Sequence, residues 1–159
     1  MLLKDAVNCA NTGLDAIKRA PIIQYPTDCK CLRIQDVTQC KQFEDWGYTL
    51  VSMSDKNKYL LKKGDIIIAR TGATVGANKY IKSNVNSVYN NGLIRLRCNS
   101  DYLPYYVYLA IQTDSFATHI KAVSCGTSAQ PNLQIGDLLK FSFKEHTKIE
   151  QQHIVDSKC

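Results

Sequence analysis

The chain has 159 residues, a length typical of a single domain. A globular chain of this size buries about two-thirds of the surface that it exposes when unfolded, which is enough to form a core. Hydrophobic residues make up 45% and charged residues 21%, ordinary values that exclude a disordered chain. The net charge of +6 favours a partner that carries phosphates or other anions, although many proteins of this charge bind none.

Neither a signal peptide nor a membrane span is expected, because Lys4 and Asp5 interrupt the apolar start and no apolar run is long enough to cross a bilayer. We therefore expect a cytoplasmic protein. Its seven cysteines are odd in number and lack a framework spacing, which indicates reduced thiols. Cys29, Cys31 and Cys40 do not have the paired spacing of a zinc site, so no metal is expected.

The first sixty residues show short elements separated by polar stretches. An amphipathic element is expected around residues 2–7, followed by a segment that two prolines keep irregular. Alternation of apolar and polar residues predicts strands over 32–35 and 48–53. A serine at position 54 is placed to cap a short helix that continues through residue 61.

The middle of the chain contains the clearest strand signals. Residues 66–69 form an apolar run typical of a buried strand. Residues 70–76 then contain glycines and small hydroxyl side chains in place of large apolar ones, which indicates a turn. A further strand is predicted over 78–81. The Asn-Asn-Gly sequence at 90–92 is a strong turn signal before an alternating strand over 93–96.

The last third is mostly helical. Apolar residues at helical spacing predict a helix over 102–112, and a second helix is expected over 116–123. Residues 124–132 are small and polar, which is typical of a loop. A short helical turn and a strand over 139–143 follow, and a capping threonine precedes a final helix that begins at Lys148. These elements predict an α+β fold with a twisted, mostly antiparallel sheet flanked by short helices.

Three segments, in this order, resemble the specificity subunits of type I restriction-modification enzymes. They are Leu32-Arg33-Ile34-Gln35-Asp36, the apolar strand and Gly-rich turn from Lys63 to Gly76, and the stretch from Tyr102-Leu103-Pro104-Tyr105-Tyr106 through Gly126-Thr127 to Glu150-Gln151 and Ile154-Val155. Two features depart from the family. The family has a proline-rich stretch at the position where this chain has Lys144-Glu145-His146-Thr147. The full subunit of the family also contains two such domains. The chain therefore corresponds to a half-subunit or an excised domain.

The resemblance implies a target-recognition domain over residues 1–146 and the truncated start of a conserved helix over 147–159. Such a domain recognises one half of a bipartite DNA target. The implied partners are double-stranded DNA, a methyltransferase subunit, an endonuclease and translocase subunit reached through the complex, and a second copy of the half-subunit. No catalytic residue or cofactor is expected in this chain, since S-adenosylmethionine would be bound by the methyltransferase. The alternative is an interaction module that docks on the methyltransferase without reading DNA.

The candidate DNA-binding residues combine cations for phosphates with amides and hydroxyls for base edges. They are Arg33, Lys41, Gln42, Lys56, Lys58, Arg70, Thr71, Gly72, Thr74, Lys79, Lys82, Lys121, Thr127, Ser128, Gln130 and Asn132. The Gly-rich turn equally fits a tight strand connection, and the lysine clusters and the 124–132 loop also fit a solvated surface. The target sequence does not follow from these residues.

Two catalytic interpretations fail on the residues themselves. A phosphate-binding nucleotide loop ends in Gly-Lys-Ser or Gly-Lys-Thr, whereas Gly76 is followed by Ala77 and Asn78. Cys125 and His119 have the chemistry of a nucleophile and its base, but they fit better as a buried thiol and a surface imidazole.

Overall fold

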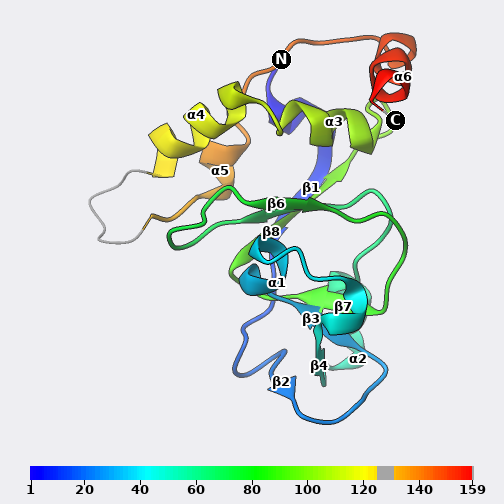
Figure 1. Cartoon of the computed structure of the whole chain (residues 1–159), viewed down its shortest axis with the longest axis vertical. Coiled ribbons are helices and arrows are strands. Elements are labelled where there is room, and N and C mark those ends of the chain that lie inside the picture. Colours follow the sequence, from blue (N-terminus) through cyan, green and yellow to red (C-terminus); the bar gives the residue numbers. More distant parts are fainter. Residues whose placement is uncertain (125–130, 159) are drawn as a thin grey trace.

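The computed structural model describes residues 1–124 and 131–158 (Figure 1). Its helices and strands are short, and the last four elements are all helices. In chain order they are η1 (Leu3–Ala6), β1 (Val7–Thr12), β2 (Ile22–Ile23), β3 (Lys30–Leu32), α1 (Ile34–Thr38), η2 (Phe43–Asp45), β4 (Gly47–Thr49), α2 (Met53–Tyr59), β5 (Ile66–Ala69), β6 (Asn78–Tyr80), β7 (Ser87–Tyr89), β8 (Leu93–Cys98), α3 (Pro104–Ala110), α4 (Asp114–Ser124), α5 (Ile135–Leu138) and α6 (Lys148–Ser157).

The first sheet has the strand order β1-β8-β5-β6, and each neighbouring pair is antiparallel. Both faces of its central strand β5 are covered. Ile66 and Ile68 pack into a core beneath η1, α3, α4 and α5, while Ile67 and Ala69 pack into a second core on the opposite face. Successive side chains of a strand point to opposite faces, so a sheet buried on both sides needs a continuous apolar run.

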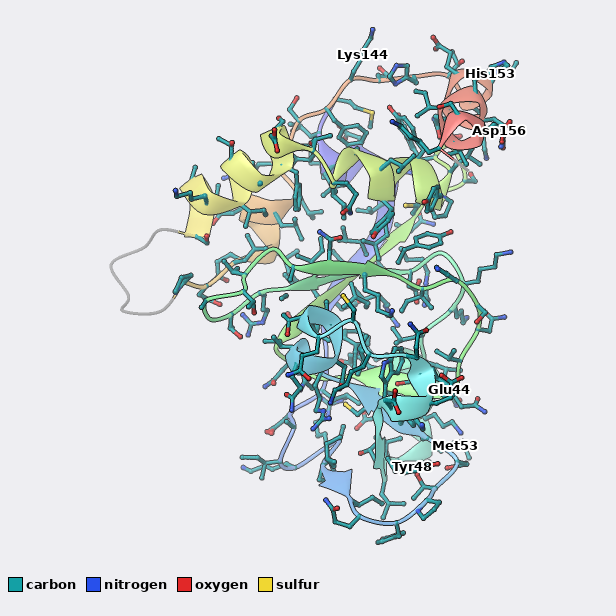
Figure 2. The ribbon with its side chains drawn as sticks, viewed as in Figure 1. Glu44, Tyr48, Met53, Lys144, His153 and Asp156 are labelled. Carbon is teal, nitrogen blue, oxygen red and sulfur yellow. The ribbon has the colours of Figure 1, made fainter. Side chains whose placement is uncertain are left out.

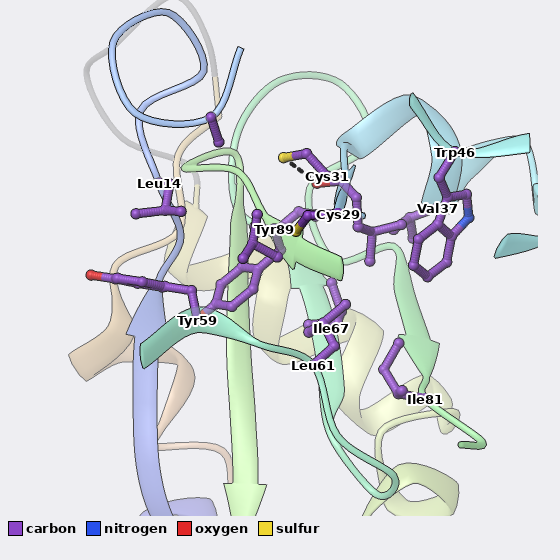
Figure 3. Close-up of a cluster of buried hydrophobic side chains, with 14 of the residues drawn as sticks. Leu14, Cys29, Cys31, Val37, Trp46, Tyr59, Leu61, Ile67, Ile81 and Tyr89 are labelled. Carbon is purple, nitrogen blue, oxygen red and sulfur yellow. Dashed lines mark hydrogen bonds between the residues drawn. The ribbon is translucent and has the colours of Figure 1, made fainter. Parts of the chain in front are cut away.

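The second sheet has the order β2-β4-β3-β7 and is mixed, because β3 and β7 run parallel while the other pairs are antiparallel. It lies on the side of the first sheet away from α3 and α4 (Figure 1). Figure 3 shows the core between the two sheets, to which Leu14, Leu61, Tyr89 and Ile67 of β5 all belong.

The chain passes between the sheets at a tight crossing. Gly13 donates its N–H to the carbonyl of Leu93 at 3.2 Å, and Leu14 donates to that of Tyr89 at 2.9 Å. A Cβ atom on Gly13 would lie 2.3 Å from the carbonyl oxygen of Tyr89 and 2.4 Å from that of Asn90. Real Cβ atoms do not approach so closely, so this position requires glycine.

The final helix α6 is anchored to the body of the domain through Gln151, which is almost fully buried. Its amide donates to the carbonyls of Asp101 and His146, and its side-chain oxygen accepts the N–H of Leu103 at 2.8 Å. Thr147 caps the helix as predicted, with its hydroxyl accepting the N–H of Glu150 at 3.2 Å. Figure 1 shows both termini at the end of the molecule opposite β2.

The α+β fold class is confirmed, with the strands divided between two sheets where one was expected. The strands predicted over 66–69, 78–81 and 93–96 are present as β5, β6 and β8, and the helices predicted over 102–112 and 116–123 are present as α3 and α4. The amphipathic element around 2–7 contains η1.

Several sequence predictions in the first half were wrong at their ends. The strand placed over 32–35 is the end of β3 followed by α1, because the buried carboxylate of Asp36 accepts the N–H of Arg33 and begins a helix there. The strand placed over 48–53 ends at Thr49, and α2 is capped by Ser52, whose hydroxyl accepts the N–H of Asp55, not by Ser54.

Other strands were missed or misplaced. The segment after η1 was expected to be irregular, but β1 pairs there with β8, and the short strands β2 and β7 were not predicted. The strand expected over 139–143 is only an isolated bridge between Ser142 and Leu2. Of the predicted 124–132 loop, residue 124 belongs to α4 and residues 125–130 lie outside the described part of the chain.

We predict that Gly13→Ala lowers the free energy of unfolding by about 3 kcal/mol, because the new methyl group must displace two backbone carbonyls. Gly136→Ala is the matched control. Gly136 lies in α5 with open space at its Cβ position, so alanine there should raise stability by up to about 1 kcal/mol. Urea unfolding followed by circular dichroism measures both, and equal effects would contradict the tight crossing.

Candidate nucleic-acid interface

The positive charge of the protein is concentrated around the second sheet. Residues 13–63 and 79–90, which form that sheet, its helices and the connection from β6, contain eleven of the twenty Lys and Arg residues but only six of the fourteen acidic ones. In the rest of the chain the numbers of basic and acidic residues are nearly equal. A cationic region of this kind attracts phosphate backbones over a distance comparable to the Debye length.

Three predicted residues meet at a surface hollow of about 280 Å³ between η2 and β6, which we call the β6 hollow. Gln42 lies on its η2 side, and Lys79 and Lys82 lie on its β6 side. The ammonium of Lys79 lies 5.9 Å from the centre of the Trp46 ring, within the range of a cation–π contact. Among the described residues neither lysine forms an ion pair, so their charges are free to meet a phosphate.

Arg33 and Lys41 lie together around the buried carboxylate of Asp36. The Nε atom of Arg33 is 3.2 Å from one carboxylate oxygen, and Nζ of Lys41 is 3.8 Å from the other. Since a buried carboxylate needs paired cations, much of this positive charge serves to hold α1 in place. The two residues therefore have less charge to offer to DNA than Lys79 and Lys82.

The Gly-rich turn after β5 is tied to the segment that precedes α5. Arg70 donates from Nε to the carbonyl of Asn91 at 2.8 Å and from a terminal nitrogen to Oδ1 of Asn132 at 3.1 Å. Gly72, at a φ of +80°, donates its N–H to the carbonyl of Pro131 at 3.0 Å. Thr71 forms an isolated bridge with Asn132, and Thr74 is exposed near the tip of the turn.

The remaining candidates are scattered. Lys56 pairs with Asp28 at 3.2 Å, and Lys58 lies over the ring of Tyr59 at 5.4 Å. Lys121 lines a separate hollow of about 490 Å³ next to the Gly-rich turn. Thr127, Ser128 and Gln130 lie outside the described residues, as does Cys125.

Sequence reasoning missed Lys30, which lies in β3 and is only 8% exposed. Its ammonium donates to the carbonyls of Phe43 at 3.0 Å and Glu44 at 2.9 Å. It also lies 4.8 Å from the ring centres of both Phe43 and Tyr48. No local pattern marks such a residue, because its partners come from η2 and β4 and are brought there by the sheet.

The described cysteines are thiols that differ in exposure: Cys29 and Cys31 are buried, Cys9 and Cys98 are partly buried, and Cys40 is exposed. Cys9, Cys29, Cys31, Cys40 and Cys98 are all unpaired. Burial raises the pKa of Cys31 to about 12 and that of Cys98 to about 12. Within residues 1–124 and 131–158, no three His, Cys, Asp or Glu side chains gather as metal ligands.

His119 contacts the backbone, since its Nε2 atom lies 2.8 Å from the carbonyl oxygen of Asp137.

Within residues 1–124 and 131–158, no helix is both long and apolar enough to cross a bilayer.

Comparison with known families gives one match that covers most of the chain. The sequence model described as the type I restriction modification DNA specificity domain matches residues 26–157. A comparison with curated proteins finds no match.

Solved structures resemble the fold at low sequence identity. An S subunit of a type I restriction-modification system from M. genitalium shares 17% identity with a TM-score of 0.64, and an HsdS subunit from Thermoanaerobacter tengcongensis shares 11% with a TM-score of 0.67. A structure from work on assembly of the type I R-M system shares 12% with a TM-score of 0.68. These matches cover 98–99% of this chain but only 37–40% of the other chains.

Alkylation by iodoacetamide at pH 8 should distinguish the cysteines of the folded protein. A thiol whose pKa is about 12 is ionised in only about one molecule in ten thousand at that pH, so Cys31 and Cys98 should stay unmodified. Cys40 is exposed at the end of α1 and should react first. Peptide mass spectrometry identifies the modified residues, and rapid labelling of Cys31 would contradict its burial.

Proposed function

The chain belongs to the type I restriction-modification DNA specificity domain family, and we propose that it is a sequence-specific DNA-binding domain that recognises one half of a bipartite target. The observation that carries the proposal is the family match over residues 26–157. The positive charge around the second sheet supports it independently, because DNA binding depends mainly on contacts with phosphates.

In this proposal the chain supplies recognition and its partners supply the chemistry. A methyltransferase subunit would bind S-adenosylmethionine, and an endonuclease subunit would join through the complex. Residues 1–146 would form the recognition domain, and residues 147–159 would begin the helix that connects it to the rest of the assembly. Such a reader would work in the cytoplasm, where the cellular DNA lies.

The two ends of the molecule suit these two tasks. Figure 2 shows Glu44, Tyr48 and Met53 in the half that contains the second sheet, while Lys144, His153 and Asp156 lie at the opposite end with α6. We infer that the first end faces DNA and that the second end meets partner subunits.

A single domain is expected to be an incomplete reader. About three base contacts at roughly 1 to 3 kcal/mol each discriminate by about 3 to 9 kcal/mol, which is marginal against the competing sites of a genome. A second domain, or a second copy of this chain, would add its own half of the target. Linking two readers raises the effective concentration of the second at its site.

One observation favours the alternative function, that of a docking module. An apolar groove of about 630 Å³ lies between α3, residues 141–146 and α6, and Leu109, Phe143 and Ile154 line it. A groove of this kind fits a protein partner. Docking and DNA recognition use opposite ends of the molecule, so separate measurements distinguish them.

We predict that the chain sets the methylation motif of its complex. Co-expression with the methyltransferase subunit in a host without adenine methylation should produce one methylated motif, detected by single-molecule sequencing, and omission of this chain should abolish it. A chain that co-purifies with the methyltransferase but yields no motif would favour the docking module.

Lys79→Ala and Lys82→Ala together should weaken binding of the complex to all duplexes by a similar factor, because both lysines would meet phosphates. The slope of log affinity against log salt should decrease in magnitude by about 0.9 for each phosphate that is no longer neutralised. Fluorescence anisotropy over a salt series measures this, with Lys4→Ala as the matched control, because Lys4 is exposed in η1 and lies outside the apolar groove. An unchanged slope would place the DNA elsewhere.

A further inference from the structure

The turn η2 is held through two of its backbone carbonyls and the ring of Phe43, and these contacts do not use the side chain of Glu44. The ammonium of Lys30 donates hydrogen bonds to the carbonyls of Phe43 and Glu44, and it lies over the rings of Phe43 and Tyr48. A buried charge is tolerated only where dipoles and aromatic faces replace water, so these four contacts act as one unit. The turn is therefore fixed in position by a cation that contacts its main chain.

Glu44 occupies a particular place on this turn. Its side chain is exposed and lies between two hollows, the β6 hollow and a hollow of about 450 Å³ lined by Lys30, Tyr48 and Asn86. Among the described residues its carboxylate forms neither a hydrogen bond nor an ion pair, even though Lys79 and Lys82 line the same β6 hollow. Asp45, the neighbouring acid, lines neither hollow.

A carboxylate in a DNA-binding region has a restricted chemistry. It repels phosphates, so it cannot add to backbone binding. What it can do is accept a hydrogen bond from an exposed amino group, and in the major groove the N4 amino group of cytosine is the usual partner of Glu and Asp. The lysines beside it would hold the flanking phosphates and bring the base edge to the carboxylate.

We propose that Glu44 is a specificity-determining residue that accepts a hydrogen bond from the amino group of cytosine at one position of the target, and that Lys30 is its positioning residue. The inference rests on the proposed function and deepens it, because it names the residue and the base. The geometry that supports it is the pinned turn, the free carboxylate and the adjacent unpaired lysines.

The test uses the complex with the methyltransferase subunit and a plasmid library in which every position of the parental motif is varied. Methylation read by sequencing gives the preference for each base at each position. Glu44→Ala should reduce the preference for cytosine at one position by about tenfold, the size of one base contact, and leave the other positions unchanged. Asp45→Ala is the matched control, because Asp45 is the neighbouring exposed acid on the same turn and lines neither hollow, and it should change no position.

Lys30→Met removes the charge that holds the turn in place. It should weaken the base preference at the same target position as Glu44→Ala does. The double variant should lose no more preference there than either single variant, since the two residues act through one contact. A Lys30→Met chain that loses preference at every position together would overturn the positioning role, because that pattern reports a general loss of structure.

The outcomes separate the two proposals. A parental complex with no methylated motif would overturn the proposed function itself. A clear parental motif that Glu44→Ala leaves intact at every position would overturn only the role of Glu44. Relaxation of a position that selects a base other than cytosine would overturn the assignment of the base.

Discussion

The arrangement of the two halves depends on two arginines of β8 that hold the segment returning from α2 to the first sheet. Arg97 contacts the fully buried carboxylate of Asp65 with two nitrogens, at 2.8 and 2.7 Å, and this hydrogen bonding raises its pKa. Arg95 lies 5.2 Å from the ring centre of Tyr89 and donates to the carbonyls of Lys58 and Leu60 at 3.3 and 3.4 Å. Buried ion pairs offset their desolvation only with good geometry, and the bidentate contact provides it.

These contacts of Arg95 and Arg97 hold the segment between α2 and β5 against β8, and so fix the second sheet relative to the first sheet and the helices on it. Arg95 and Arg97 share one face of β8 with Leu93, whereas Ile94 and Leu96 point into the other core. The face of β8 on the side of the second sheet is therefore charged at one end, at Arg95 and Arg97, and apolar at the other, at Leu93. The proposed DNA reader would need such rigidity, because its base contacts would have to be held at a set distance from the end proposed to bind partner subunits.

Sequence patterns were reliable where a strand has a clear apolar run or alternation, whereas the six-residue β1 was missed because its sequence, half of it Asn and Thr, shows neither. Ile66 to Ala69 and Leu93 to Leu96 were placed correctly, and so was the final helix, which has a local capping box. The strands of two or three residues in the second sheet are shorter than any detectable period, and their pairing depends on partners distant in sequence. For the same reason Lys30 could not be identified from the sequence. Gln42, Lys79 and Lys82 were chosen as candidates one by one from residue type, and the structure places them at one hollow.

Both points of attachment in the basic half use main-chain carbonyls. Lys30 holds those of Phe43 and Glu44, and Arg95 holds those of Lys58 and Leu60. A carbonyl is present whatever the side chain, so exposed residues of η2 and α2 can change without disturbing either attachment. Asp65 and Asp36, by contrast, act through buried carboxylates and belong to the scaffold. A fold built in this way can keep its architecture while the exposed groups of its basic half vary, which is what the proposed function would require of a domain type that reads different targets.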